Sequence, residues 1–185
     1  MSTAKKLVIL DRDGVINHDA DEFIKSPDEW RPIAGSLEAI ARLNQAGYRV
    51  VVATNQSGVG RGLFDMATLN AIHLKMHQAA AALGARIDAV FFCAHTAHNN
   101  CDCRKPKPGM LQMIAERFNI EPTITPMVGD AQRDLAAGAA LGFPVHLVLT
   151  GKGRATYEAG MLPSGTKVHP DLWAFALDFL ANSTV

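Results

Sequence analysis

Three short apolar runs, each ending in a side chain that can bind or react, constrain the fold of this chain most. The runs and the polar residues that follow them are Lys6–Leu10 with Asp11, Val50–Ala53 with Thr54, and Pro126–Gly129 with Asp130. Runs of this length are typical of strands buried on both faces. Side chains so distant in the sequence can converge only if the strands are parallel, because their carboxyl ends then share one edge of the sheet.

Segments with helical spacing of apolar residues separate these runs. We expect helices from a cap at Ser36 to Gly47, from Asp65 to Gly84, over 111–118, from Asp130 to Gly142 and over 172–180, and further strands at 89–92 and 144–149. Strands that alternate with helices predict an α/β fold, namely a three-layer, doubly wound, mostly parallel sheet. The loop over 17–32 is too short for a separate cap domain, so we expect one domain over 1–185.

The composition is that of an ordinary globular domain and argues against several classes of partner. Hydrophobic residues make up 48% and charged residues 19% of the 185 positions, and Lys plus Arg balance Asp plus Glu at 18 each. Lys5 and Lys6 precede only four apolar residues, too few for a signal peptide. We find no membrane-spanning stretch of roughly 20 apolar residues. We expect a cytoplasmic monomer that binds neither nucleic acid nor membranes.

The first strand is followed by two carboxylates, in Asp11-Arg12-Asp13-Gly14. Asp11 is placed to act as a nucleophile or metal ligand, and Asp13, beyond a tight turn that Gly14 allows, as a general acid or base. So short a motif also occurs in plain turns and in calcium-type loops. Two later segments favour phosphate chemistry: the hydroxyl and amide groups of 54–57 suit phosphate oxygens, and the loop at 103–109 is basic.

In order and residue type these segments resemble the motifs of the haloacid dehalogenase superfamily of phosphatases, over residues 7 to about 150. The likeness is closest to the bacterial heptose bisphosphate phosphatases, which serve heptose nucleotide-sugar synthesis for lipopolysaccharide. The segments that carry it are 11–17, 26–30, 54–58 and 101–106. The resemblance implies hydrolysis of a small-molecule sugar bisphosphate.

The charges of such a reaction suggest a role for each residue. Magnesium prefers oxygen ligands, and Asp11, the backbone carbonyl of Asp13, and Asp130 are the ones we predict. Lys105 and Thr54 would stabilise the phosphate oxygens while Asp11 forms an aspartyl-phosphate. Asp13 would protonate the leaving oxygen, for which its pKa should exceed that of Asp11, which magnesium holds ionised. Asp134 is either a supporting residue of the metal site or a first-turn helix carboxylate.

Loops must recognise the substrate where no cap encloses it. Arg104 is a candidate fork for the second phosphate, with a plain surface arginine as the alternative. The remaining predicted substrate-binding residues are Asp19, Asp21 and Glu22, which the resemblance places against the sugar hydroxyls, and Asn55, Gln56 and Ser57. A solvated acidic loop is the alternative for the three carboxylates. The stretch between His95 and Cys101 is shorter than in many members of the family, so the α or β anomer stays open.

All three cysteines lie within eleven residues, which argues against a disulfide framework. Cys93, His95, Cys101 and Cys103 supply four donors in two pairs of matching spacing, which fits a closed, structural zinc site. His98 could replace His95, although the spacing and the family favour His95. Folding this loop around zinc would fix the neighbouring Arg104, giving zinc a positioning role only.

Two other functions compete with this interpretation. A histidinol-phosphate phosphatase would share the catalytic residues and the zinc loop but would act on a cationic substrate with one phosphate. An inactive phosphosugar-binding module would need no nucleophile, and the intact Asp11, Asp13 and Lys105 argue against it.

Overall fold

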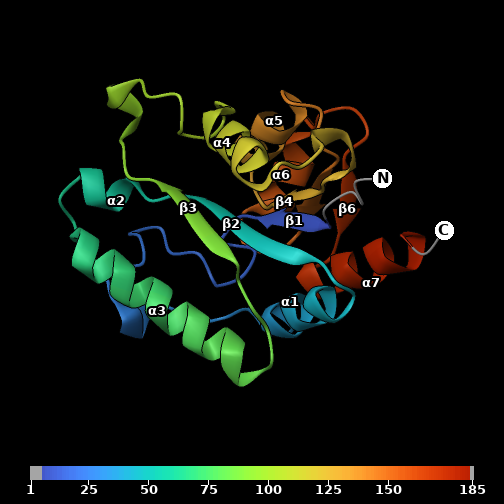
Figure 1. Ribbon diagram of the computed structural model, residues 1–185. Helices are drawn as coiled ribbons and strands as arrows, with labels where there is room; N and C mark the ends of the chain where they lie inside the picture. Colours follow the sequence, from blue (N-terminus) through green and yellow to red (C-terminus); the bar gives the residue numbers. More distant parts are fainter. Residues whose placement is uncertain (1–5, 184–185) are drawn as a thin grey trace.

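A computed structural model describes residues 6–183 and contains one six-stranded sheet in the order β3-β2-β1-β4-β5-β6 (Figure 1). The strands are β1 (Leu7–Leu10), β2 (Arg49–Asn55), β3 (Ala89–Cys93), β4 (Met127–Gly129), β5 (Val145–Val148) and β6 (Lys167–His169). All five neighbouring pairs are parallel. The chain builds outward from β1 in one direction and then, from β4, in the other. The switch point between β1 and β4 is where open sheets of this kind bind ligands.

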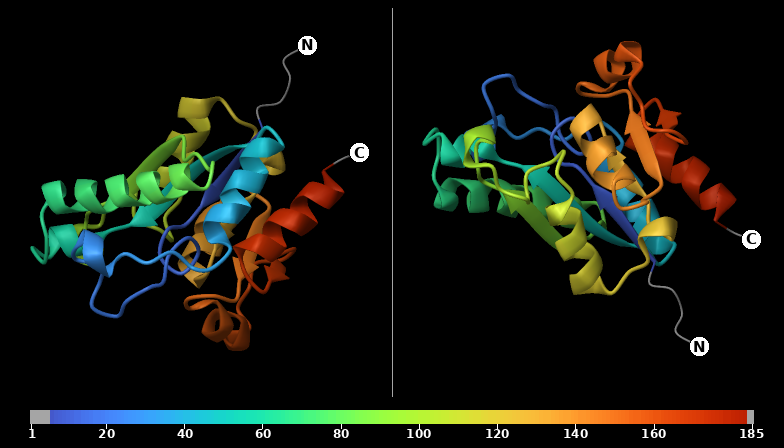
Figure 2. Two further views of the ribbon diagram at one scale, coloured as in Figure 1. Left: turned by 90° about the horizontal axis from the view of Figure 1, so that it is seen from below. Right: turned by 90° about the horizontal axis from the view of Figure 1, so that it is seen from above.

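Helices cover both faces of the sheet, as the views in Figure 2 show. They are α1 (Ser36–Gln45), α2 (Ser57–Gly60), α3 (Met66–Ala82), α4 (Gly109–Phe118), α5 (Gln132–Ala139), α6 (Gly153–Ala159) and α7 (Leu172–Asn182), with short 3₁₀ helices η1 (Pro27–Glu29), η2 (Ala97–Asn99) and η3 (Pro122–Ile124). Because side chains alternate along a strand, Val8 and Leu10 pack with α1, α3 and α7, whereas Leu7 and Ile9 pack with α4 and α5. The predicted three-layer architecture is confirmed.

The predicted helix ends are correct at some positions and wrong at one. Asp65 caps α3, and its carboxylate accepts from the backbone nitrogen of Thr68 at 2.8 Å. Ser36, by contrast, is the first residue of α1, and the cap is Gly35, in the left-handed conformation with φ of 82°. The Ser36 hydroxyl donates to the carbonyl of Val15 instead, at 2.8 Å. This bond ties α1 to the turn that carries the two predicted catalytic carboxylates.

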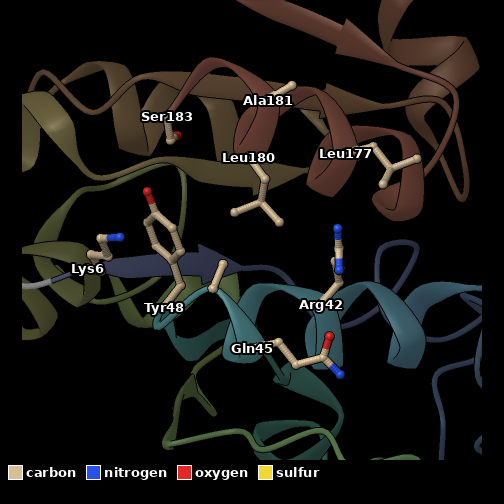
Figure 3. A pocket seen from close by; sticks show the side chains of 9 residues that line it. Lys6, Arg42, Gln45, Tyr48, Leu177, Leu180, Ala181 and Ser183 are labelled. Carbon is tan, nitrogen blue, oxygen red and sulfur yellow. The ribbon is translucent and has the colours of Figure 1, made fainter. Parts of the chain in front are cut away.

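The long loop after β1 lies against α3, where Lys75 donates to the carbonyl of Pro27 at 2.6 Å. At the other end of the strands, where β1 and β2 begin, a hollow of about 530 Å³ opens between α1 and α7 (Figure 3). Lys6, Arg42 and Tyr48 line it together with apolar residues of α7. It is remote from the strand ends that carry the polar groups.

Lys5 lies outside the described residues, and among residues 6–183 no helix is both long and apolar enough to cross a bilayer.

Candidate active site

Asp11 lies at the switch point of the sheet, directly after β1. It is buried, and its backbone nitrogen donates to the carbonyl of Val128 in β4 at 2.9 Å, which fixes the chain at the strand end. One carboxylate oxygen accepts from the backbone nitrogen of Arg12 at 2.8 Å and lies 3.0 Å from the Lys105 ammonium. The predicted nucleophile is thus held by a neutral backbone amide and by a positively charged ammonium.

Lys105 is a buried ammonium shared by two carboxylates. Its Nζ lies 3.0 Å from Asp11 and 2.7 Å from Asp134, and it donates to the carbonyl of Ala53 at 2.6 Å. Burial alone would lower its pKa, but the two negative charges outweigh burial and raise it. The backbone of Lys105 is clamped by Asn55, whose amide donates to its carbonyl at 2.9 Å and accepts from its nitrogen at 3.1 Å.

Three carboxylates, of Asp11, Asp130 and Asp134, bring ligand atoms within 4.8 Å of one another. Burial, followed by repulsion from Asp134, raises the pKa of Asp130 to about 8 and that of Asp11 to about 6. One oxygen of Asp130 accepts from the backbone nitrogen of Lys152 at 2.8 Å, and the other is buried without a hydrogen bond among the described residues. A buried oxygen without a partner, amid an excess of negative charge, is suited to a bound cation.

Asp134 occupies the first helical turn, which is one of the two alternatives that the sequence left open, and it also contacts Lys105. It stands in the first turn of α5, where its carboxylate accepts from the backbone nitrogen of Ala131 at 3.0 Å, and its other oxygen meets Lys105. Two glycines leave room for the carboxylate of Asp130 close to the backbone. A Cβ atom at Gly14 or at Gly151 would collide with the carboxylate of Asp130.

The predicted acid or base, Asp13, is gripped by donors on both oxygens. Oδ1 accepts from Arg12 at 3.0 Å and Asn17 at 2.9 Å, and Oδ2 accepts from Arg12 at 3.1 Å and Gln56 at 2.8 Å. Burial would raise its pKa, but the Arg12 guanidinium and the amide donors lower it. The protein's own groups alone therefore place the pKa of Asp11 above that of Asp13, and the order that we predicted requires magnesium at Asp11. To carry a proton, Asp13 must first lose one of these donors.

The polar residues at the end of β2 and directly after it are mostly engaged inside the site. Thr54 is buried, and its hydroxyl accepts from the Gln56 amide at 2.9 Å. Asn55 holds the backbone of Lys105, and Ser57 is buried at the start of α2. The geometry thus gives Asn55 and Gln56 contacts within the protein in addition to the substrate contacts that we predicted for them.

The cysteine loop, residues 93–103, brings together the four side chains predicted to bind zinc. The Cys93 sulfur lies 3.6 Å from that of Cys101 and 3.3 Å from that of Cys103, and the Nδ1 of His95 lies 3.6 Å from Cys93 and 3.4 Å from Cys103. A tetrahedron with Zn–S bonds of about 2.3 Å has edges of about 3.7 Å, so the spacing fits. His98 is not among the clustered donors.

The predicted substrate-binding loops converge less closely. Arg104 is half-buried and donates to the carbonyl of His95 at 3.2 Å. Asp19 and Asp21 line a hollow of about 350 Å³ beside Lys152, whose ammonium lies 3.2 Å from the Asp19 carboxylate. Glu22 is exposed and lies in a neighbouring hollow of the same loop.

Our sequence analysis missed three residues of this region: Arg12, His73 and Lys152. Arg12 is fully buried beside Asp13, and its place inside the acidic motif is a signal that was available. His73 contacts Arg12 from α3, but its spacing among apolar residues predicts only a helix face. Lys152 reaches the site from the loop after β5, and no local pattern indicates this.

Residues 4–142 match the haloacid dehalogenase-like hydrolase family, to which the chain therefore belongs. Within that family it is a phosphomonoester hydrolase. Two similar proteins, from Bordetella bronchiseptica and Neisseria meningitidis serogroup B, are named D-glycero-β-D-manno-heptose-1,7-bisphosphate 7-phosphatase. The first is 57% identical over 96% of this chain and 99% of its own, and the second 50% identical over 97% of each.

Solved structures give the same picture. The D,D-heptose 1,7-bisphosphate phosphatase of B. bronchiseptica, complexed with magnesium and phosphate, matches with a TM-score of 0.95 at 56% identity over 96% of this chain and 99% of that one. The corresponding phosphatase of Burkholderia thailandensis matches with a TM-score of 0.79 at 66% identity over the same shares. Both support the α/β fold described above.

Proposed function

We propose that this protein hydrolyses the C7 phosphate of D-glycero-β-D-manno-heptose 1,7-bisphosphate, in the cytoplasm and in the synthesis of ADP-heptose for lipopolysaccharide. The observation that carries the proposal is the convergence of Asp11, Lys105 and Asp130 at the switch point, in a chain that matches the named relatives over nearly its whole length. The shared name of these relatives favours the β anomer. We take the chain to be one domain and a monomer.

Asp11, the backbone carbonyl of Asp13, and Asp130 are the residues that we propose to hold magnesium. The unpartnered buried oxygen of Asp130 and the convergence of the carboxylates of Asp11, Asp130 and Asp134 support this assignment. When bound, magnesium would offset the carboxylate charge and polarise a phosphate oxygen. Asp134 already binds Lys105 and the start of α5, which favours a supporting role for it.

The protein groups then divide the reaction into two steps. An oxygen of Asp11 attacks phosphorus, the bond from phosphorus to the sugar oxygen breaks, and Asp13 donates a proton to that oxygen. Water next attacks the aspartyl-phosphate, Asp13 takes its proton, and phosphate leaves with Asp11 regenerated. Lys105 and the Thr54 hydroxyl stabilise the charge on the phosphate oxygens throughout.

Zinc is proposed to be structural, held by Cys93, His95, Cys101 and Cys103. The near-tetrahedral spacing of these donors supports the assignment. Arg104 follows Cys103 directly, so the ion would set the position from which its guanidinium can bind the C1 phosphate. Asp19, Asp21 and Glu22 would accept hydrogen bonds from the sugar hydroxyls, with Asn55, Gln56 and Ser57 completing the site.

Phosphate release from a substrate panel tests the proposal. The panel holds both anomers of the heptose 1,7-bisphosphate, histidinol phosphate, and p-nitrophenyl phosphate as a generic aryl ester. We expect the highest kcat/KM with the β bisphosphate and a dependence on added magnesium. A preference for histidinol phosphate would replace the proposed substrate, and no turnover of any ester by metal-loaded protein would overturn the enzymatic assignment.

A further inference from the structure

Arg12 stands between the two predicted catalytic carboxylates and is fully buried. Its Nε and Nη2 donate to the two oxygens of Asp13, at 3.0 and 3.1 Å, which is the bidentate geometry that fixes a carboxylate in both position and plane. A fork of this kind aligns Asp13 only as well as the guanidinium is itself aligned. The position of Asp13 therefore depends on the groups that hold Arg12.

The rest of the guanidinium is held by two neutral acceptors from distant parts of the chain. Nη2 also donates to the side-chain oxygen of Gln56 at 3.1 Å, and Nη1 lies 3.2 Å from Nε2 of His73. A guanidinium has only donors, so His73 must accept with a free lone pair and carry its proton on Nδ1. Burial, followed by the charge of Arg12, lowers the pKa of His73 to about 4, in keeping with a neutral ring.

His73 is an unusual choice for its position. It lies on the buried face of α3 with Leu69, Ile72 and Met76, and its ring lies 6.1 Å from that of Phe92. An apolar side chain would satisfy such a face, and burying a polar ring is favourable only when it has a partner. Its partner is Arg12, 61 residues earlier in the chain.

We propose that His73 is a positioning residue for the acid/base Asp13, acting through Arg12. Two acceptors other than Asp13, namely Gln56 directly after β2 and His73 on α3, hold the guanidinium in its plane, and the guanidinium in turn orients Asp13. Without His73, Nη1 is left buried and unpaired, and the guanidinium can tilt. Small misplacements of a proton donor lower rates strongly, since a shift of about 1 Å can cost about 100-fold. The inference rests on the proposed role of Asp13.

The experiment compares leaving groups. His73→Leu removes the acceptor at similar size, His73→Gln keeps one, and His77→Ala, one turn further along α3, is the matched control. Each variant is assayed by kcat/KM with the heptose bisphosphate and with p-nitrophenyl phosphate. This ratio covers steps up to phosphoryl transfer, and the nitrophenolate leaves without needing a proton. If wild-type protein prefers another alkyl phosphate, that ester serves equally, so a wrong substrate assignment does not affect this test.

We expect His73→Leu to lower kcat/KM by roughly 10- to 100-fold with the alkyl phosphate and by less than about threefold with the aryl phosphate. The loss should appear in kcat, His73→Gln should restore most of it, and His77→Ala should match wild type. Equal losses on both substrates would reduce His73 to a structural role. Wild-type activity in His73→Leu, or no recovery in His73→Gln, would also overturn the proposal. If His73→Leu does not fold, His73→Ala carries the same comparison.

Discussion

The carboxylate site and the cysteine loop are linked by Lys105, which contacts Asp11 and follows Cys103 by two residues, but they are built in opposite ways. Asp11 and Asp130 follow central strands and are completely enclosed, so the sheet fixes them. In the loop only Cys93 belongs to a strand, and His95, Cys101 and Cys103 lie on a segment with a single short 3₁₀ turn. The first region is ordered by hydrophobic packing, and the second has little apolar surface to bury.

The difference bears on the metal ion that we propose for each place. Oxygen ligands prearranged by a sheet suit a hard cation that must be reached by substrate and water. Sulfur and nitrogen ligands on a loop suit zinc, whose binding energy can replace the missing core. Substitutions in the carboxylate site should therefore impair catalysis and leave the surrounding fold intact. Substitutions in the cysteine cluster should disturb the whole loop as well as catalysis.

The largest expected effect separates the two regions cleanly. Asp11→Asn should reduce turnover by at least roughly 10⁴-fold, because an amide cannot form the acyl phosphate. The fold and the zinc content should remain intact, since the sheet and the cysteine loop do not require this carboxylate. Substantial activity in a contamination-controlled, metal-loaded Asp11→Asn sample would refute the covalent mechanism, and Asp102→Asn, an exposed carboxylate, is the control.

Disrupting the loop should affect both regions. We expect about one zinc ion per chain in the wild-type protein and none in the double variant Cys101→Ser/Cys103→Ser. Turnover by the double variant should fall by roughly 10- to 100-fold on every substrate, because the loop no longer supports Arg104 and Lys105. Metal analysis and proteolysis within 94–108 check this result. Full zinc occupancy in the double variant would show that the ligands are others. His98→Ala, whose imidazole is outside the cluster, should keep its zinc.

A narrower effect is expected where the loop meets substrate. Arg104→Ala should lower kcat/KM about ten- to a hundredfold for the bisphosphate, corresponding to a lost charge-assisted contact of roughly 1.5–3 kcal/mol. A monophosphate should be little affected, because Lys105 serves the reacting group. Lys107→Ala, in the same loop, provides the comparison. Parallel losses on both substrates would assign Arg104 to the reacting phosphate or the loop fold and would favour histidinol phosphate.

The smallest effect concerns a buried polar pair that needs no metal. His146 lies on β5 and His169 on β6, with Nδ1 of His146 3.0 Å from Nε2 of His169. Burial and the neighbouring His169 lower the pKa of His146 to about 3, and burial lowers the pKa of His169. Unfolded histidine titrates near 6.5, so this pair contributes its full stability above about pH 6.5 and loses it as the pH falls toward 3. At pH 5.5 the loss should be about 1–2 kcal/mol.

Denaturant unfolding at pH 7 and pH 5.5, with and without chelator, measures this loss. In the double variant His146→Leu/His169→Leu the acid-induced loss should shrink, whereas chelator should leave it unchanged. An unaltered pH dependence in the double variant would assign the acid sensitivity to other groups.

The fold was predictable wherever a segment carried a complete local signal. Asp65 combines a capping side chain with the apolar stripe of α3, and the apolar runs before Asp11 and Asp130 left few alternatives to buried strands. β6 was missed because it has three residues, two of them exposed, and so lacks an apolar pattern. Gly35 was missed because a serine at the next position gave a stronger capping signal than a glycine with positive φ.

In the site, residues within motifs were predictable and their mutual contacts were not. Asp11, Lys105 and Asp130 come together as the parallel topology required. The contact between Arg12 and His73 joins a strand end to a helix face across a large sequence separation, and no spacing rule indicates it. The relative pKa of Asp11 and Asp13 also depends on burial and on donors supplied by the tertiary structure.

The clamp between Asn55 and Lys105 has a consequence for how this enzyme can diversify. Both backbone polar groups of Lys105 are bound by a side chain at the end of β2, so the sheet helps to fix its position in addition to the folded loop before it. Insertions or deletions between His95 and Cys101 can then reshape substrate recognition while the ammonium keeps its register with Asp11. Substrate selectivity can therefore change in evolution without a change in the reacting groups. Chimaeras that exchange only the residues between His95 and Cys101 should retain turnover of a generic aryl phosphate.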